Sequence, residues 1–186
     1  MIKVIFLDRD GVINEYPGDR QYVTSLKAFK FLPGSLGAIK ILSSAGFKIF
    51  VVSNQAGVSK GLYSKTELNK ITRFMLKGVK RAGGRLEKVL YCLHTDKMNC
   101  LCRKPKIGLL KKVASKKRVD FDNSYFIGDS LIDVKTGKTF GTKTILVFTC
   151  REKLKNSSGW DVQPDFVAKT LKDAAKNIVN GKYERA

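Results

Sequence analysis

The sequence lacks any apolar run long enough to cross a membrane or to serve as a signal peptide. The N-terminal stretch MIKVIFLDRDG has only a short apolar segment before Asp8 interrupts it. A signal peptide carries a longer apolar region with a cleavage site, and a membrane span needs about 20 apolar residues. We therefore expect no membrane partner and a cytoplasmic location.

Acidic residues are scarce. The chain has 16 Asp and Glu against 36 Lys and Arg, a net charge of +20. Such an excess favours anionic partners, among them phosphorylated metabolites, nucleic acid and acidic surfaces. The basic residues are nevertheless scattered, and their densest run, KKVASKKR at 111–118, is typical of the solvated face of a helix. Charge alone does not choose among these partners.

Internal repeats, low-complexity segments and linkers are also missing. The 186 residues fit one domain, residues 1–186, which is large enough to bury roughly 70% of its unfolded surface. We expect this domain to act as a monomer.

Short apolar runs alternate with helical patterns along the chain. The expected strands are residues 3–7, 47–53, 88–93, 124–128 and 142–148, and the expected helices are 35–45, 65–82, 107–118, 131–140 and 169–180. Buried strands that alternate with helices form parallel sheets covered on both faces. The predicted fold is α/β, a three-layer Rossmann-like sheet of about five to six parallel strands with helices on both faces.

Polar residues follow the expected strands at the points where they end. Asp8 and Asp10 follow the first, Ser53 and Asn54 the second, a Cys/His cluster the third and Asp129 the fourth. Ligands of open parallel sheets bind at the carboxyl ends of the strands. This recurrence predicts an active site at that edge.

Two aspartates in LDRDG lie two residues apart, before a glycine that lets the chain turn. Carboxylates this close resist joint ionisation unless a cation neutralises them. With Asp129 and Asp133 from GDSLID, Asp8 and Asp10 form an all-oxygen set suited to Mg²⁺. The alternative, in which the first pair only caps a turn, loses weight once the second pair is counted.

Four segments, DRDG, VVSNQAG, CRKP and GDSLID, occur in an order that resembles the haloacid dehalogenase-type phosphatases. The Cys/His loop is similar to the branch that holds heptose bisphosphate phosphatases and the phosphatase half of histidinol-phosphate enzymes. The resemblance spans about residues 2 to 180. It implies hydrolysis of a phosphate monoester.

The resemblance also implies residue roles. Asp8 is the expected nucleophile, which forms an aspartyl-phosphate, and Asp10 the expected general acid and base. Ser53 and Lys104 are expected to bind the phosphoryl oxygens. The expected Mg²⁺ ligands are Asp8, the main-chain carbonyl of Asp10 and Asp129. Asp133 is expected to orient Lys104 or metal-bound water rather than to bind the metal itself.

The only histidine and three of the four cysteines lie together in YCLHTDKMNCLCRKP. Cys92, His94, Cys100 and Cys102 make a complete tetrahedral Zn²⁺ set, which leaves no open position and therefore predicts a structural ion. The alternative is incidental buried thiols and a core histidine. Cys150 stands apart as an expected free thiol.

Three further residues are candidates for substrate binding. Arg103 offers a planar fork suited to a second phosphate or a carboxylate. Lys60 and Asn54 lie in the loop after the second strand. No inserted cap domain is visible after the first or third motif, so we expect an open site.

Two departures from the family pattern bear on the substrate. Ser130 stands where sugar-phosphate and histidinol-phosphate members often carry Lys or Arg, and the Cys/His loop lacks the usual prolines. The leading hypothesis is removal of the C7 phosphate of D-glycero-D-manno-heptose 1,7-bisphosphate. The alternatives are a histidinol-phosphate phosphatase, a nucleic-acid 3′-phosphatase and a zinc-containing binding module without turnover.

Overall fold

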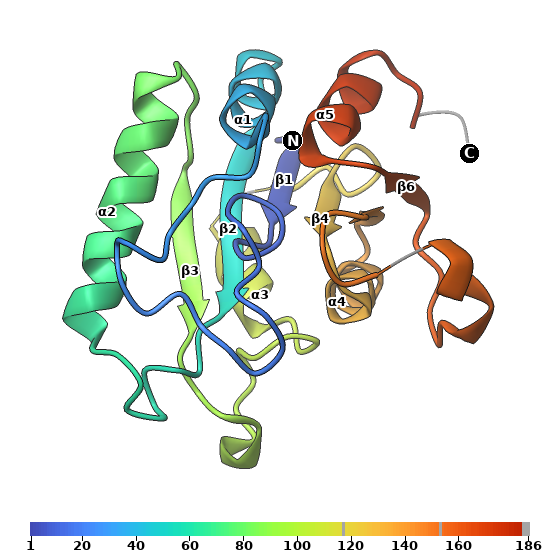
Figure 1. Ribbon diagram of the computed structural model, residues 1–186. Coiled ribbons are helices and arrows are strands. Elements are labelled where there is room, and N and C mark those ends of the chain that lie inside the picture. The colour runs from blue at the N-terminus through green and yellow to red at the C-terminus, as the bar shows by residue number, and fades with distance from the viewer. Residues whose placement is uncertain (117, 153, 184–186) are drawn as a thin grey trace.

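The computed structural model describes residues 1–116, 118–152 and 154–183, and its strands form one parallel sheet (Figure 1). The sheet has six strands in the order β3-β2-β1-β4-β5-β6. The strands are β1 Val4–Leu7, β2 Lys48–Asn54, β3 Lys88–Cys92, β4 Tyr125–Gly128, β5 Lys143–Val147 and β6 Phe166–Ala168. The α-helices are α1 Ser35–Ser44, α2 Lys65–Arg81, α3 Gly108–Ala114, α4 Leu131–Phe140 and α5 Leu171–Val179.

Helices cover both faces of the sheet, as predicted (Figure 1). Alternate residues of β1 point to opposite faces: Ile5 and Leu7 pack in the core under α1, α2 and α5, and Val4 and Phe6 pack in the core with α3. All four are fully buried. A strand apolar on both faces is stable only between two helical layers, so the three-layer architecture follows from its sequence.

Local signals explain where two of the helices begin. The Ser64 hydroxyl accepts a hydrogen bond from the Glu67 N–H at 3.0 Å and caps α2, and Thr170 caps α5 in the same way through the Asp173 N–H at 3.2 Å. Such caps satisfy main-chain donors that have no partner inside the helix. The buried residues of α2 recur at helical spacing, at Leu68, Ile71, Met75 and Val79.

One expectation was wrong in detail. The third helix was predicted over 107–118 but α3 spans only Gly108–Ala114, because no buried apolar residue follows Val113 in the lysine-rich run to hold another turn. Residue 117 lies outside the described residues. The six strands agree with the predicted five to six, but the position of β6 was not located, since its three residues are too few to show a periodicity.

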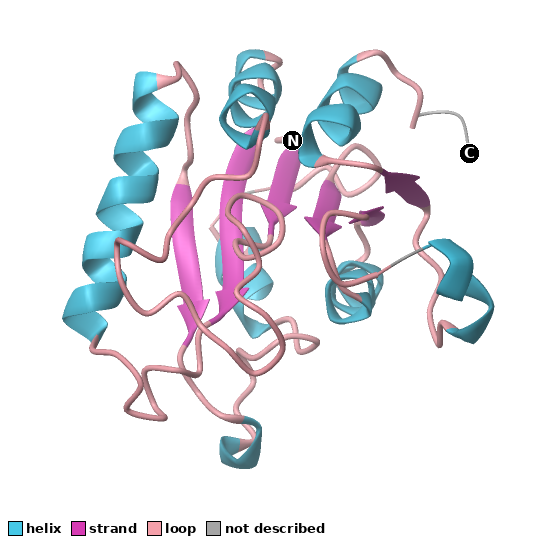
Figure 2. Cartoon of the chain, viewed as in Figure 1, coloured by secondary structure: helices cyan, strands magenta, loops and turns pink. Residues whose placement is uncertain are grey.

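The carboxyl ends of β1, β2 and β3 reach the same edge of the sheet, where long loops gather (Figure 2). The loops that follow β1 and β2, residues 8–34 and 55–64, contain no helix or strand, so no large cap covers this edge. Among the described residues, no helix is both long and apolar enough to span a membrane.

Candidate active site

The predicted site residues meet in one pocket at this edge of the sheet. Its cavity measures about 260 Å³. The predicted residues that line it are Asp8, Asp10, Ser53, Asn54, Lys60, Arg103, Lys104 and Asp133. Asp129 is fully buried beneath the pocket, with its ligand oxygen within 4.8 Å of those of Asp8 and Asp133. Residues from four strand ends therefore share one site.

A buried cation lies between two carboxylates at the centre of the pocket. Lys104 Nζ lies 3.0 Å from Asp8 Oδ1 and 2.6 Å from Asp133 Oδ1, and only 3% of the lysine side chain is exposed. Burial disfavours its charge, but Asp133 and Asp8 outweigh that effect and hold the pKa of Lys104 above its usual value. Lys104 thus stays protonated and donates a hydrogen bond to Asp133.

The aspartates also fit a divalent cation. Neither side-chain oxygen of Asp129 has a hydrogen-bond partner among the described residues. Burial raises the pKa of Asp129 to about 8 and that of Asp8 to about 6, the latter in spite of Lys104. An unpartnered buried carboxylate beside two others requires either protons or a cation. This donor set therefore fits Mg²⁺.

Gly11 shapes the floor of this cation site. Its φ is +83°, and a Cβ there would lie 2.1 Å from Asp129 Oδ2. The Thr149 hydroxyl, which follows β5, donates a hydrogen bond to the Gly11 carbonyl. Only glycine combines this backbone conformation with such a close approach.

Asp10 is held by three side chains that were not singled out from the sequence. Its Oδ1 accepts from Arg9 Nε at 3.0 Å and Nη2 at 2.9 Å, and from Asn14 Nδ2 at 2.8 Å. Its Oδ2 accepts from Arg9 Nη2 at 3.0 Å and from Gln55 Nε2 at 2.8 Å. Arg9, Asn14 and Gln55 are fully buried, which is unusual for such polar residues. Arg9 and Gln55 lie inside the motifs DRDG and VVSNQAG, directly beside predicted residues, whereas Asn14 lies just beyond the first motif and had no such signal.

Ser53 and Asn54 end β2 with different partners. The buried Ser53 hydroxyl accepts from Gln55 Nε2 at 3.1 Å and keeps its own proton for another acceptor. The Asn54 amide pairs with the main chain of Lys104, donating to its carbonyl at 3.1 Å and accepting from its N–H at 3.0 Å. Asn54 was predicted to bind substrate. Although it lines the pocket, its hydrogen bonds hold Lys104 in place.

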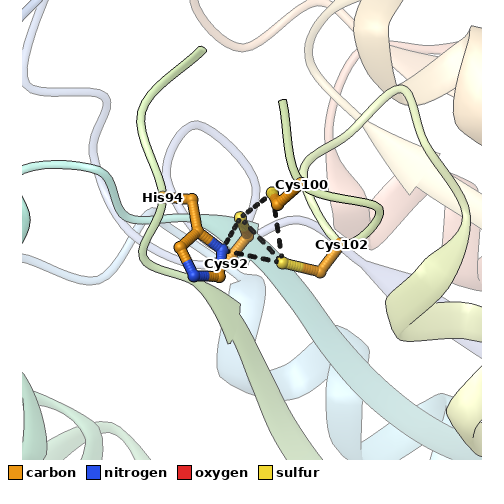
Figure 3. A group of neighbouring side chains, drawn as sticks. All are labelled: Cys92, His94, Cys100 and Cys102. Atoms are coloured by element: carbon orange, nitrogen blue, oxygen red, sulfur yellow. Dashed lines mark hydrogen bonds between the residues drawn. The ribbon is translucent and has the colours of Figure 1, made fainter. Parts of the chain in front are cut away.

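The four side chains of the Cys/His cluster point toward one another (Figure 3). Cys92 Sγ lies 3.7 Å from His94 Nδ1, 3.6 Å from Cys100 Sγ and 3.2 Å from Cys102 Sγ. His94 Nδ1 to Cys102 Sγ measures 3.1 Å. A tetrahedron with Zn–S bonds of about 2.3 Å has edges of similar length. The four donors also lie within 4.8 Å of one another, and all four cysteines of the chain are free, so this set fits Zn²⁺.

Two of the predicted substrate-binding cations lie toward the rim. The Arg103 fork binds both carboxylate oxygens of Asp96 and donates to the His94 carbonyl at 3.3 Å. Asp96 is 85% exposed, and exposed ion pairs contribute only about 0–1 kcal/mol. Lys60 is exposed, with Nζ 5.3 Å from the centre of the Tyr22 ring. Lys60 is therefore accessible to an anionic ligand, whereas Arg103 lines the pocket with its guanidinium bonded to Asp96 and His94.

The rim carries two further arginines that the sequence did not reveal. Arg20 and Arg151 also line the pocket, from loops after β1 and β5. Nothing in their local sequence distinguishes them from the many other basic residues. Ser130, which also lines the pocket, does not lie free at the rim: its hydroxyl donates a hydrogen bond to Asp133 Oδ2 at 2.6 Å.

Comparisons with known proteins agree with this site. Residues 101–174 match a family model described as HAD-hydrolase-like. The D-glycero-beta-D-manno-heptose-1,7-bisphosphate 7-phosphatase of Neisseria meningitidis serogroup A is 33% identical over 96% of this chain and 95% of its own length. The D-glycero-alpha-D-manno-heptose-1,7-bisphosphate 7-phosphatase of Campylobacter jejuni is 33% identical over 81% of this chain and 85% of its own.

Structural likeness points the same way. The crystal structure of D,D-heptose 1,7-bisphosphate phosphatase from B. bronchiseptica, complexed with magnesium and phosphate, superposes with a TM-score of 0.88. It is 31% identical, and the match covers 96% of this chain and 99% of that one. The bifunctional histidine biosynthesis protein HisB of Blochmanniella floridana is 34% identical over 77% of this chain but only 40% of its own length.

Fold and site together define a phosphatase of the haloacid dehalogenase-like class. Within that class, the chain belongs to the family that contains the D-glycero-D-manno-heptose-1,7-bisphosphate 7-phosphatases.

Proposed function

We propose that this phosphatase removes the C7 phosphate of D-glycero-D-manno-heptose 1,7-bisphosphate through an aspartyl-phosphate on Asp8. One observation carries the proposed chemistry. The Asp8 carboxylate shares a pocket with the buried cation of Lys104 and lies within 4.8 Å of the unpartnered carboxylate of Asp129. A nucleophile, a phosphate-binding cation and a metal ligand are the groups that phosphoryl transfer requires.

In the first half of the reaction, Asp8 attacks phosphorus while the bond to the sugar oxygen breaks. Lys104 and Ser53 stabilise the negative charge on the phosphoryl oxygens. Asp10 donates its proton to the departing alkoxide. In the second half, Asp10 takes a proton from water, whose oxygen attacks phosphorus, releases inorganic phosphate and restores Asp8.

We assign Asp8, Asp129 and the main-chain carbonyl of Asp10 as the magnesium ligands. When bound, magnesium supplies positive charge to the phosphoryl group and to the carboxylates around it. Asp133, bonded to Lys104 and Ser130, keeps the role of orienting Lys104. Gly11 leaves the space that Asp129 needs.

We assign zinc to Cys92, His94, Cys100 and Cys102 as a structural ion. Four protein ligands leave no position for water or substrate, so the ion takes no part in the chemistry. The bound ion would hold the loop in one conformation. That loop in turn positions the side chains of the next two residues along the chain, Arg103 and Lys104.

The rim supports a bisphosphate over a monophosphate. Arg20, Lys60, Arg103 and Arg151 line the pocket around the residues that bind the first phosphoryl group. This positive rim suits a second phosphate, as in the substrate named for the relatives from Neisseria and Campylobacter. Histidinol phosphate, the second candidate suggested by the HisB relative, would bring an ammonium group to the same rim. The Neisseria relative is named for the beta anomer and the Campylobacter relative for the alpha anomer, so both anomers belong in the test of this substrate.

We also propose that the monomer is the active unit, because one chain supplies the nucleophile, the general acid and base, the phosphate-binding cation and the carboxylates of the metal site. The cytoplasmic location remains a prediction from the sequence.

The proposal is tested by phosphate release from a substrate panel: both anomers of heptose 1,7-bisphosphate, histidinol phosphate, fructose 1,6-bisphosphate and a 3′-phosphorylated oligonucleotide. We expect one heptose anomer to give the highest kcat/KM. Asp8→Asn should abolish turnover and leave the far-UV circular dichroism unchanged. Faster hydrolysis of histidinol phosphate than of either heptose anomer would overturn the substrate, and normal turnover by Asp8→Asn would overturn the mechanism.

A further inference from the structure

The side chain of Gln55 connects Asp10, the proposed general acid, to Ser53, one of the proposed phosphate-binding residues. Its Nε2 donates to Asp10 Oδ2 at 2.8 Å and to Ser53 Oγ at 3.1 Å. Its Oε1 accepts from the Tyr63 hydroxyl at 2.6 Å. Gln55 is fully buried, so these bonds have no competition from solvent.

Tyr63 determines which way round the Gln55 amide lies. Asp10 Oδ2 accepts a hydrogen bond from the Gln55 NH₂ group, which leaves the amide carbonyl facing Tyr63. The Tyr63 hydroxyl supplies the donor for that carbonyl. Burial raises the pKa of Tyr63 and keeps its proton in place. Without the Tyr63 hydroxyl, the buried Gln55 carbonyl would have no hydrogen-bond donor. The present orientation of the amide would then no longer be favoured.

Main-chain contacts and packing hold both residues in place. The Gln55 N–H donates to the Cys92 carbonyl at 2.7 Å, across the β2–β3 pair. A Cβ at Gly57 would lie 2.4 Å from the Tyr63 ring and 2.9 Å from that of Tyr22. The loop after β2 is thus packed so closely that the Tyr63 hydroxyl has little freedom to move.

Gln55 differs from the other partners of Asp10 in where it comes from. Arg9 and Asn14 belong to the same loop as Asp10 and would move with it. Gln55 lies 45 residues away, in the loop after β2, and within the described part of the chain it is the one side chain from outside the loop of Asp10 that binds this carboxylate. It therefore fixes Asp10 relative to Ser53, and so relative to the bound phosphoryl group.

We propose that Gln55 is a positioning residue for proton transfer, which holds the Asp10 carboxylate toward the leaving-group oxygen, and that Tyr63 fixes the amide that does so. The inference rests on the proposed function, in which Asp10 protonates the leaving group. Positioned proton transfer contributes about 10²- to 10⁴-fold to rates. Because Gln55 contacts Asp10 only at its side chain, the loss of Gln55 should remove part of that contribution without moving Asp8, Lys104, Asp129 or the main-chain carbonyl of Asp10.

The consequence depends on the leaving group. A sugar alkoxide needs a proton to depart, whereas p-nitrophenolate is a stable anion that leaves without one. The ratio of kcat/KM for the two esters reports the first half-reaction, up to formation of the aspartyl-phosphate. It excludes the second half, in which Asp10 acts on water. General loss of structure lowers both values together and leaves their ratio unchanged.

The test compares wild type with Gln55→Met, which keeps the length of the side chain, and with Tyr63→Phe, which removes one oxygen. Both are assayed with p-nitrophenyl phosphate and with the best sugar phosphate of the panel. We expect Gln55→Met to lower kcat/KM for the sugar phosphate about 10- to 100-fold and for p-nitrophenyl phosphate less than about 3-fold. Tyr63→Phe should shift the ratio in the same direction by a smaller factor.

Two controls separate positioning from stability. Thr144→Val removes a fully buried hydroxyl on β5, far along the sheet, and should lower Tm without changing the ratio. In an Asp10→Asn background, Gln55→Met should change the ratio no further. Equal losses on both esters, or an added loss in that background, would overturn the inference. A wild type that hydrolyses neither ester would instead overturn the proposed function.

Discussion

At the scale of single residues, the site depends on which way a few side chains turn. Asp10 and Asp8 are two positions apart, yet Asp10 faces Arg9, Asn14 and Gln55 while Asp8 faces Lys104. Neighbours on an extended chain point to opposite sides, and two positions bring them back to the same side. The chain turns at this point, so spacing alone could not assign a partner to either carboxylate.

Gly11 provides the sharpest prediction at this scale. Gly11→Ala should lower magnesium affinity or activity by about 10- to 100-fold, because the new Cβ would displace Asp129. Gly46→Ala is the matched control: its φ is +87°, but nothing lies within 4 Å of the added Cβ. Both variants should lose about 1–2 kcal/mol of stability to backbone strain. Magnesium titrations that show the same loss for both would contradict the packing argument.

At the scale of elements, each part of the site follows the end of a strand and is hydrogen-bonded to a neighbouring loop. Asn54 at the end of β2 bonds the main chain of Lys104, which follows the Cys/His loop at the end of β3. The Thr149 hydroxyl, after β5, donates to the carbonyl of Gly11, after β1. The loops therefore support one another across the edge of the sheet.

The Cys/His loop should act as one unit with the cations behind it. Cys102→Ser removes one proposed zinc ligand directly before Arg103 and Lys104. We expect loss of bound zinc by atomic spectroscopy and a fall in kcat of roughly 10-fold or more, with the magnesium titration midpoint unchanged. Cys150→Ser, outside the cluster, should retain both zinc and activity. Full activity in a zinc-free protein would contradict the structural role.

Asp165 joins β6 to β5 and α4. It accepts hydrogen bonds from the Thr144 N–H at 2.8 Å and hydroxyl at 2.7 Å, and from Lys138 Nζ. Burial alone would raise the pKa of Asp165, but these donors outweigh it and lower that pKa.

Asp165→Asn should therefore lower Tm at pH 7 by about 2–5 °C. Because the folded-state pKa is depressed, the contribution is present above the unfolded value near 3.9 and is lost as pH falls through the folded one. Thermal melts should show the two proteins converging below about pH 4. Asp161→Asn breaks only an exposed pair with Lys135 and should change Tm little. A gap that persists at low pH would rule out the ionic contribution.

At the scale of the whole molecule, the net charge of +20 does not identify the partner. Basic residues line the pocket rim, but Lys111, Lys112 and Lys116 in the densest run are exposed on and after α3. The charge therefore provides a general attraction for anions, and the pocket provides selectivity. These are separable by experiment, since general attraction depends on salt.

We expect affinity for a 3′-phosphorylated duplex to fall at least about 10-fold between 50 and 200 mM salt, with no release of its phosphate. A duplex ending in a 3′-hydroxyl should bind equally well, because the pocket does not read that end. Fluorescence anisotropy measures binding and a phosphate assay measures turnover. Faster release from the oligonucleotide than from the sugar bisphosphates would establish the nucleic-acid alternative.

The sequence by itself determined the layered parallel sheet, the carboxylates and cations at its strand ends, and the Cys/His cluster. These features are encoded locally, in apolar runs and in the residues that follow them. The position of strand β6 and the end of α3 could not be predicted from the sequence, because short or weakly anchored segments carry little local signal.

Only the tertiary structure decided how those residues are connected. It buried Arg9 against Asp10, turned Asn54 toward Lys104 and joined Gln55 to Tyr63 and Asp10. Such partners depend on strand order and on the paths of loops. A side chain in a buried site must satisfy its hydrogen bonds with whatever the fold brings near, and the fold brings together residues that are far apart in the chain.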